Sequence, residues 1–506
     1  MALSAFKGVS IADVEASIFS EIQKLYLEDD VPWVVGYSGG KDSTATLQLI
    51  WRALANLPES DRGKPVHVIS TDTLVENPII ASWVNRSLQV MGEAAKEQSL
   101  PVRSHRLTPK LQDTYWVNLI GRGYPAPRRM FRWCTERLKI SPSNGFIRDV
   151  VKESGEAIMV LGTRKAESAM RARSMKRMEA KRMRDRLSPN SSLPNSLVYT
   201  PIEDWSNDDV WAYVTQIDNP WGYDNRDLLT MYQGASEDGE CPLVVDTTTP
   251  SCGDSRFGCW VCTLVDEDKS MTAMIQNDED KEWMQPLLDL RNELDPKNED
   301  PESRDFRRMS GLVQLFYKRK EKGSEEREDA VIRGPYVQSY RELWLRRVLS
   351  AQTSVRENGP ESVSEIELIS FDELEEIRKI WLLDKHEFED SLPIIYEEET
   401  GDKYPGQQFD DQRLFGATEV ALLNDICEGN DLQVQMLREL IDTEHRYRTK
   451  MNRRGLFEAL EKTIKKHFYE DEADGFQYAL DMKEARQSTE QQIEKLSIPE
   501  IVRKET

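Results

Sequence analysis

A short apolar stretch, two adjacent glycines and a helical pattern follow one another between Val34 and Leu47. The apolar residues end in Ser-Gly-Gly-Lys-Asp-Ser, which runs from Ser38 to Ser43. Paired glycines let the backbone approach an anion closely, and the N-terminus of a following helix offers unpaired N–H groups to that anion. The spacing is not that of a Walker A loop. The run therefore predicts a buried strand, a phosphate-binding loop and a helix, in that order.

Further short strands alternate with helical patterns along the first half of the chain. The expected elements are a helix over residues 11–29 and strands at residues 31–35, 66–73, 102–107 and 157–164. This alternation predicts an α/β fold with a parallel twisted sheet and helices on both faces, whose ligand lies beyond the carboxyl ends of the strands. Residues 188–196 contain two prolines and two asparagines, and we expect a mobile loop there.

The character of the sequence changes near Met271. Charged helical segments follow, glycine and proline become rarer, and β-branched runs are scarce. A chain of 506 residues exceeds what one hydrophobic core usually serves. We therefore expect two domains, residues 1–270 and a mostly helical, acidic domain of residues 271–506. Its clearest periodic stretches are residues 287–294, 340–349, 371–382 and 432–447.

The formal net charge is −23, which argues against a surface that binds nucleic acid throughout. A basic island is the exception, with ten lysines and arginines against three acidic residues between Arg164 and Arg186. Such an island can guide a phosphate backbone, form an ordinary solvated helix, or serve only a bound nucleotide. The chain shows no membrane-spanning stretch and no signal-peptide pattern at its start, so we expect a cytoplasmic protein without a membrane partner.

Several segments carry the same residue types, in the same order, as a known superfamily. They are Ser38 to Ser43, the Ser-Thr-Asp-Thr of residues 70–73, the Arg-Trp-Cys-Thr of residues 132–135 with Lys139, the Gly-Thr-Arg-Lys-Ala-Glu-Ser of residues 162–168 with Arg171 and Arg173, and the Trp-Ser-Asn-Asp-Asp-Val-Trp of residues 205–211. The first segment resembles the PP-loop of ATP pyrophosphatases. The others resemble segments of that superfamily and of its phosphoadenylyl-sulfate reductase branch.

The resemblance implies an adenine nucleotide alpha hydrolase-like fold and an enzyme that binds ATP, adenylates an oxygen of its substrate and releases pyrophosphate. Negative charge then develops on the leaving group, and we expect Lys41, Arg164 and Arg171 to stabilise it. Surface ion pairing is the alternative for the two arginines. A carboxylate suits Mg²⁺ beside phosphate oxygens, which makes Asp42 the expected ligand. The residues expected to bind the nucleotide are Ser38, Gly39, Gly40, Lys41, Asp42, Ser43, Thr44, Asp72 and Gly162.

Six cysteines are too few for a disulfide framework in a chain of this length. Four of them, Cys241, Cys252, Cys259 and Cys262, fall in one short segment. Four thiolates can hold Zn²⁺ or an iron–sulfur cluster, or stay unmetallated. A zinc ribbon would show two Cys-x-x-Cys knuckles, and here only one is present, which favours a [4Fe–4S] cluster.

The fourth cluster ligand stays open. The ligands of assimilatory sulfonucleotide reductases are split between an upstream pair and a downstream Cys-x-x-Cys, so the resemblance allows Cys134 to replace Cys241. If Cys134 is not a ligand, we expect it to carry the sulfur, because the neighbouring Arg132, Arg137 and Lys139 would favour its thiolate. Cys427 lies alone in an acidic helical region and is expected to be a buried core residue.

The loop, the reductase-branch segments and the cysteine segment from Cys252 to Cys262 together resemble DndC-type sulfurtransferases of bacterial DNA phosphorothioation. This resemblance implies that ATP adenylates a phosphate oxygen of DNA and that sulfur then displaces AMP. It also implies a cysteine desulfurase as sulfur donor, and other Dnd proteins as partners, among them an ATPase and a small DNA-binding subunit.

Three other functions remain possible from the sequence. A sulfonucleotide reductase attacks its substrate with a cysteine near the C-terminus, and after Cys262 this chain has only Cys427. A tRNA thiolase shares the loop and often the cluster, but the reductase-branch segments argue against it. A DNA-bound assembly subunit that only senses ATP would need no catalysis.

Overall fold

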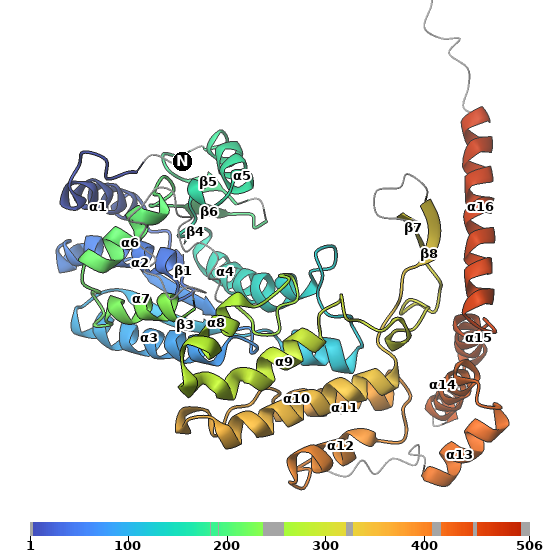
Figure 1. Cartoon of the computed structure of the whole chain (residues 1–506). Helices are drawn as coiled ribbons and strands as arrows, with labels where there is room; N and C mark the ends of the chain where they lie inside the picture. The colour runs from blue at the N-terminus through green and yellow to red at the C-terminus, as the bar shows by residue number, and fades with distance from the viewer. Residues whose placement is uncertain are drawn as a thin grey trace, which may run out of the picture. The chain divides into compact units, whose positions relative to one another are not determined.

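The computed structural model describes residues 4–182, 184–190, 192–235, 258–319, 327–406, 416–448 and 453–496 (Figure 1). The chain divides into two compact units. The first unit comprises Met1–Tyr115, Pro127–Lys297 and Ala351–Leu368, and the second comprises Trp116–Ala126, Asn298–Ser350 and Ile369–Thr506.

A six-stranded sheet forms the centre of the first unit. Its strands are β1 (Trp33–Gly36), β2 (Val66–Thr71), β3 (Val102–Leu107), β4 (Ala157–Val160), β5 (Ser188–Pro189) and β6 (Ser196–Tyr199). Their order is β3-β2-β1-β4-β6-β5, and every pairing is parallel except the one between β5 and β6. Strand β1 therefore has β2 on one side and β4 on the other, which places the reversal of strand order, where ligands bind in such sheets, at the end of β1.

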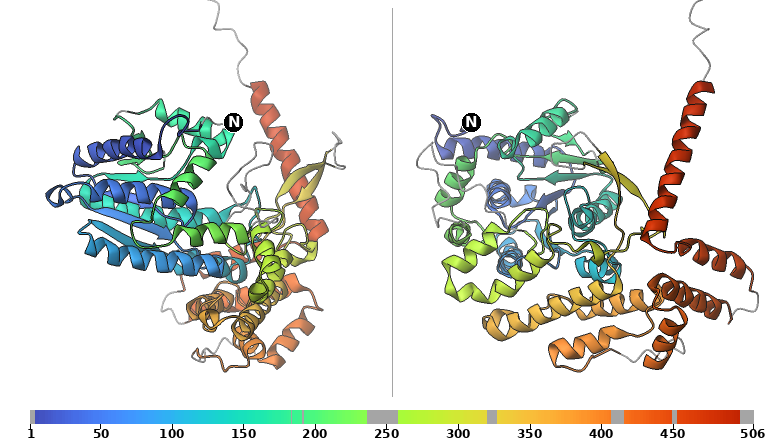
Figure 2. Two further views of the ribbon diagram at one scale, coloured as in Figure 1. Left: turned by 60° about the vertical axis from the view of Figure 1, so that its left-hand side comes forward. Right: turned by 45° about the vertical axis from the view of Figure 1, so that its right-hand side comes forward.

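Helices pack on both faces of this sheet (Figures 1 and 2). The helices before residue 236 are α1 (Ile11–Leu27), α2 (Lys41–Ala55), α3 (Pro78–Glu97), α4 (Ser141–Ser154), α5 (Ala169–Glu179), α6 (Asn207–Gln216) and α7 (Asn225–Gly234). Successive side chains of β1 point to opposite faces of the sheet and so belong to two separate hydrophobic cores. Trp33 and Val35 join the larger core with α1, α2, α3 and α6, whereas Val34 faces the smaller core with α4. The predicted α/β fold is confirmed.

The segment at residues 188–196 differs from the expected mobile loop. Its two ends belong to β5 and β6, which pair as an antiparallel hairpin, and Leu193 is buried. Asn195 has a positive φ of 56°, which turns the chain into β6. Asparagine tolerates this left-handed conformation, so the same residues that indicated a loop here build a tight turn between strands.

Helices dominate the remaining described residues, as expected. They are α8 (Lys269–Asn277), α9 (Gln285–Glu293), α10 (Gln338–Asn358), α11 (Phe371–Leu383), α12 (Ser391–Thr400), α13 (Ala417–Ile426), α14 (Asp431–Arg448), α15 (Leu456–Lys466) and α16 (Glu472–Leu496). Within the ranges that the structure describes, no helix is long and apolar enough to cross a membrane.

A hairpin in the second unit was not predicted. Strands β7 (Leu315–Arg319) and β8 (Arg327–Val331) pair antiparallel, with Lys318 opposite Glu328. Opposite charges on facing residues stabilise such a pair, but charged residues give no β signal in the sequence.

Two histidines on adjacent strands form a half-buried pair in the first unit. His67 Nδ1 lies 3.0 Å from His105 Nε2, and the ring of Phe146 packs against both. Burial, followed by the charges of His105 and Arg103, lowers the pKa of His67 to about 4. An unfolded histidine titrates near 6.5, so between pH 6.5 and 4 the unfolded chain binds more protons than the folded one.

We therefore expect stability to be full above pH 6.5 and to fall as the pH drops toward 4. The variant His67→Gln should show a smaller loss of stability between pH 7 and pH 5 than the wild type, measured as the shift of the urea unfolding midpoint. His445→Gln, on α14, is the matched control, and its loss of stability between pH 7 and pH 5 should equal that of the wild type. An equal loss in both variants would contradict this assignment.

Candidate functional site

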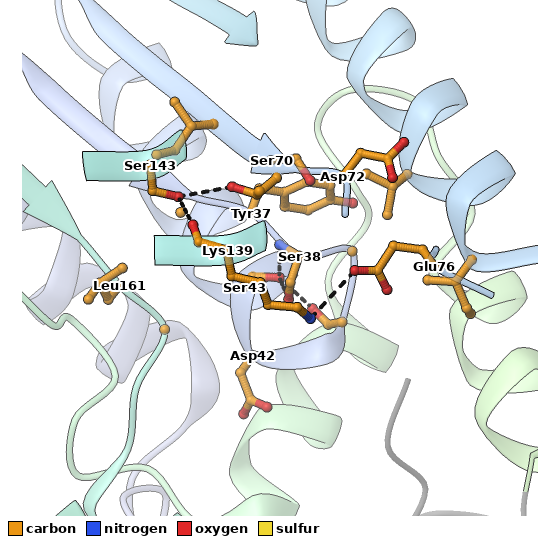
Figure 3. Close-up of a pocket in the computed structure, with 18 of the residues that line it drawn as sticks. Tyr37, Ser38, Asp42, Ser43, Ser70, Asp72, Glu76, Lys139, Ser143 and Leu161 are labelled. Carbon is orange, nitrogen blue, oxygen red and sulfur yellow. Dashed lines mark hydrogen bonds and ion pairs between the residues drawn. The ribbon is translucent and has the colours of Figure 1, made fainter. Parts of the chain in front are cut away.

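A cavity of about 620 Å³ opens at the carboxyl ends of the central strands of the first unit (Figure 3). It lies where the strand order reverses, between the loops that follow β1 and β4, as expected for an open parallel sheet. Residues after β2, the start of α4 and the end of α7 complete its walls.

The glycine loop after β1 has the geometry of an anion site. Gly39 has a φ of 75°, and a Cβ atom there would lie 2.6 Å from Val84 Cγ2, so glycine is required. Gly40 is the N-cap of α2, and no side chain caps this helix. The Ser43 hydroxyl donates to the Gly40 carbonyl at 2.9 Å and lies 3.2 Å from the Ser38 backbone nitrogen. The loop is thus held by its own serines, with the uncapped end of α2 beside the cavity.

Gly162 brings the loop after β4 against the same helix. A Cβ atom at Gly162 would lie 2.6 Å from the backbone oxygen of Asp42 and 2.9 Å from Thr46 Oγ1. Backbone atoms cannot move aside as a flexible side chain can. The absence of a side chain at Gly162 therefore allows the two loops of the cavity to touch.

Asp42 stands between two cations. Its Oδ1 atom accepts from Arg164 Nε at 2.6 Å, and its Oδ2 atom lies 3.1 Å from Lys41 Nζ. Arg164 is 3% exposed and also donates to the carbonyl of Trp205 at 3.3 Å. The backbone N–H of Arg164 donates to Glu167 at 2.7 Å. A magnesium ion that binds Asp42 would share this carboxylate with Lys41 and Arg164, or would displace one of them.

Asp72 follows the end of β2 and lines the opposite side of the cavity. Its carboxylate accepts from the guanidinium of Arg106 on β3 and, at 2.8 Å, from the backbone N–H of Leu74. Both contacts fix the orientation of the Asp72 carboxylate, which lies near Ser70 (Figure 3).

Glu76 and Lys139 form an ion pair on a further wall, with Lys139 Nζ 3.5 Å from Glu76 Oε1 (Figure 3). Lys139 lies on a π-helix (Thr135–Ile140) that leads into α4. Burial lowers the pKa of Lys139, but the negative charges of Cys259 and Glu76 outweigh burial and raise it above its usual value.

The Cys-x-x-Cys turn is joined to the cavity wall by backbone pairing. Glu76 and Cys259 form an antiparallel bridge, and the N–H of Trp260 donates to the carbonyl of Val75 at 2.9 Å. Cys259 Sγ lies 3.2 Å from Thr73 Oγ1 and 3.7 Å from Glu76 Oε1. Burial, followed by the charge of Glu76, raises the pKa of Cys259 to about 12. A cysteine predicted to bind a cluster thus contacts Glu76, a residue of the cavity wall.

Cys134 is half-buried at the start of the π-helix. Burial raises its pKa, and the nearby charge of Cys262 raises it further. Of the basic neighbours expected to favour its thiolate, Lys139 does lower the pKa of Cys134, but burial outweighs this effect and the pKa is raised. Two of those neighbours have acidic partners, since Arg137 binds Asp113 at 2.7 Å and Lys139 pairs with Glu76.

The predicted cluster ligands are only partly visible. Cys241 and Cys252 lie outside the described residues. In the described part of the chain, no three histidine, cysteine or acidic side chains are grouped so that they could hold a metal ion. Cys259 and Cys262 lie on one turn, and Cys262 is near enough to Cys134 to raise its pKa. The thiol donors that the structure does place near one another are of the type that iron–sulfur clusters use.

The basic island contains two kinds of cation. Its paired cations are Arg164 with Asp42, Lys165 with Glu179 and Asp204, Arg171 with Glu167, Arg182 with Glu203, Arg184 with Asp29, and Arg186 with Glu21 and Glu203. The exposed cations without an acidic partner in the described structure are Arg173, Lys176, Arg177 and Lys181. Three of these four lie on α5, and Lys181 follows its end.

The cavity gathers most of the predicted nucleotide residues. Those that line it are Ser38, Gly39, Gly40, Asp42, Ser43, Asp72, Gly162 and Arg171. Lys41, Thr44, Arg164 and Cys134 are not among its lining residues in the described structure. Thr44 hydrogen-bonds to the buried Tyr37 instead.

Lining residues without a clear sequence signal are Glu76, Arg106, Ser143, Met231 and Tyr232. Tyr232 is the lining residue farthest along the chain from the glycine loop. It comes from α7, yet a Cβ atom at Gly40 would lie 3.1 Å from its hydroxyl. Only the fold brings these two residues together.

Residues 32–222 match the family model of the phosphoadenosine phosphosulfate reductase domain. An uncharacterized protein of Methanocaldococcus jannaschii is 27% identical over 217 residues, which are 43% of this chain and 38% of that protein. The crystal structure of a phosphoadenylyl-sulfate (PAPS) reductase from Candida auris, in complex with phosphate, matches with 14% identity and a TM-score of 0.25, over 41% of this chain and 87% of that one. The glycine loop and both loops of the cavity floor lie inside the matched range. The match of residues 32–222 to a PAPS reductase-like domain supports the predicted superfamily branch.

Proposed function

We propose that this chain is an ATP-dependent sulfurtransferase that replaces an oxygen of the DNA backbone with sulfur. One observation carries the proposal: the Cys-x-x-Cys turn is built onto the wall of the nucleotide cavity, where Cys259 contacts Thr73 and Glu76. Nucleotide chemistry and sulfur chemistry can therefore meet on one substrate. The resemblance to DndC-type enzymes supports DNA as that substrate.

In the first step, a phosphate oxygen of DNA attacks the α-phosphorus of ATP. A new P–O bond forms, the bond to the β-phosphate oxygen breaks, and pyrophosphate leaves with the electron pair. The uncapped N-terminus of α2 and Lys41 are the groups of this chain that would stabilise the developing charge. Asp42 would hold Mg²⁺, which neutralises phosphate charge when bound.

In the second step, sulfur bonds to the activated phosphorus while the bond to AMP breaks and AMP takes the electron pair. Sulfide completes the exchange directly. A persulfide leaves an S–S bond, which a thiol reductant must break with two electrons. We propose a cysteine desulfurase as the source of this sulfur and Cys134 as its carrier, which must first lose its proton because its pKa is raised.

A [4Fe–4S] cluster is the cofactor that the cysteines suit best. Cys259 and Cys262 would hold it, with Cys252 and either Cys241 or Cys134. Such a cluster supplies a thiolate-bound iron site for sulfur or electron chemistry.

One structural observation favours this function over a sulfonucleotide reductase, with which the domain match is also compatible. The only cysteine after Cys262 is Cys427, which is 2% exposed and packs with Leu423 and Val434. A buried thiol in an apolar core is not positioned to attack a substrate. A tRNA thiolase would form thiolated tRNA in place of DNA phosphorothioate. An assembly subunit that only senses ATP would release no AMP above background.

We expect the protein to release AMP and pyrophosphate from ATP in the presence of DNA. Asp42→Asn should lower this turnover by about a hundredfold or more, because it removes the carboxylate that would hold the charge-neutralising Mg²⁺ at the reacting phosphates. The exposed Asp61→Asn is the matched control and should keep wild-type turnover. Formation of ADP, equal turnover of Asp42→Asn and the wild type, or release of sulfite from a sulfonucleotide would refute the proposal.

We expect Cys252→Ser, Cys259→Ser and Cys262→Ser each to lower iron content and visible absorption after anaerobic purification. Comparison of Cys134→Ser with Cys241→Ser identifies the fourth ligand, since only the true ligand should lose iron. Cys427→Ser is the control and should keep it. Full iron in all of the first three variants, or zinc in the wild type, would exclude the cluster.

We propose that DNA lies along α5, whose first turn reaches the cavity at Arg171. Replacing the four unpaired cations Arg173, Lys176, Arg177 and Lys181 with glutamine should weaken binding to all DNA sequences alike. The slope of log affinity against log salt should fall by about 0.9 for each lost phosphate contact. The control replaces four exposed lysines of the same unit, Lys7, Lys96, Lys110 and Lys152. If both variants bind DNA with equal affinity at low salt, α5 is an ordinary solvated helix, and partner proteins bind the DNA instead.

A further inference from the structure

Lys139 lines the nucleotide cavity beside Glu76, which also pairs with the cysteine turn. We infer that Lys139 binds the activated phosphate during the second step, at the edge of the cavity that faces the cysteine turn, and that Glu76 positions it there. This inference rests on the proposed function and adds a substrate-binding residue for sulfur transfer.

The backbone of Lys139 is anchored to the sheet. The Ser143 hydroxyl donates to the Lys139 carbonyl at 3.0 Å and lies 2.9 Å from Thr71 Oγ1 at the end of β2 (Figure 3). Both Lys139 and Ser143 line the cavity. The π-helix that carries Lys139 therefore has a fixed place beside the cavity, and π-helical turns are frequent at functional sites.

The ammonium group keeps binding capacity for a ligand. Its distance of 3.5 Å from Glu76 Oε1 exceeds that of a tight charged hydrogen bond, and the Lys139 side chain is 48% exposed while that of Glu76 is 15% exposed. A lysine has three donors, so one contact with Glu76 leaves two for phosphate oxygens. Glu76 is itself held, because it accepts from Thr73 Oγ1 at 3.0 Å.

The other cations near the cavity are placed differently. Arg164 is buried against Asp42, Arg106 is bound to Asp72, and Arg171 pairs with Glu167 at 3.3 Å. None of these carboxylates has a described contact with the cysteine turn, whereas Glu76 lies 3.7 Å from Cys259 Sγ.

The chemistry of the second step needs a cation at this place. An anionic sulfur nucleophile must approach an anionic phosphate, and a fixed positive charge beside both lowers that repulsion. The first step uses the glycine loop, on another wall of the cavity. Loss of Lys139 should therefore affect sulfur transfer far more than adenylation.

The test separates the two steps with sodium sulfide as the sulfur source. Pyrophosphate release in the first turnover reports adenylation, and phosphorothioate formed in DNA reports sulfur transfer. Lys139→Met should lower sulfur transfer by about a hundredfold and change pyrophosphate release by less than about threefold. Lys139→Arg should restore part of the transfer, because it keeps the charge. Lys152→Met, on the exposed end of α4, is the matched control and should behave as the wild type.

Equal losses in both steps would show a merely structural or ATP-binding role and overturn the inference, as would unchanged sulfur transfer in Lys139→Met. If the wild type releases no pyrophosphate, the proposed function fails and the inference fails with it. The readouts thus distinguish the two failures. Thermal unfolding of each variant shows whether a loss of activity comes from misfolding. If Lys139→Met misfolds, Lys139→Arg and Lys139→Gln are compared in the same two-step assay instead.

Discussion

The ion pair between Asp42 and Arg164 connects the two loops on which the whole site depends. One loop follows β1 and the other follows β4, on either side of the point where the strand order reverses. Gly162 lets these loops touch, and the buried guanidinium then fixes the carboxylate at the first turn of α2. A buried arginine that lost this partner would leave an uncompensated charge, which is strongly destabilising. The pair therefore constrains both the local fold and the orientation of the nucleotide loop.

The second constraint is the backbone pairing of Glu76 with Cys259. This bridge carries no side-chain specificity, yet it holds a segment from far along the chain beside the end of β2. The match to the reductase domain model ends at residue 222, so the cysteine turn lies beyond the matched range. Its attachment to a wall of the cavity, rather than to a remote surface, is what supports a sulfur reaction on a nucleotide-activated substrate.

The sequence was sufficient for the parallel sheet, the glycine loop and most of the long helices, because these depend on local patterns. Strand β3 is an example, since its bounds, Val102–Leu107, agree with the strand expected at residues 102–107. The partners of the charged residues could not be predicted. Arg182, Arg184 and Arg186 read as part of a uniform basic island, but they are bound to acidic residues up to about 165 positions away. The raised pKa of Cys134 could not be predicted either, because its cause is burial in the folded chain, whereas its basic neighbours are visible in the sequence. Tyr232 and Glu76 reach the cavity through tertiary packing alone.

The length of α5, which carries most of the unpaired cations of the basic island, limits how much DNA can lie along it. Helix α5 has 11 residues, and at a rise of 1.5 Å per residue it is about 16 Å long. A DNA duplex advances 3.4 Å per base pair, so a backbone lying along this helix is followed for about five base pairs, or half a helical turn. Such a footprint holds one phosphate group near the cavity but spans too little of the groove to read an extended sequence. The choice of which phosphate is modified would then have to come from surfaces other than α5.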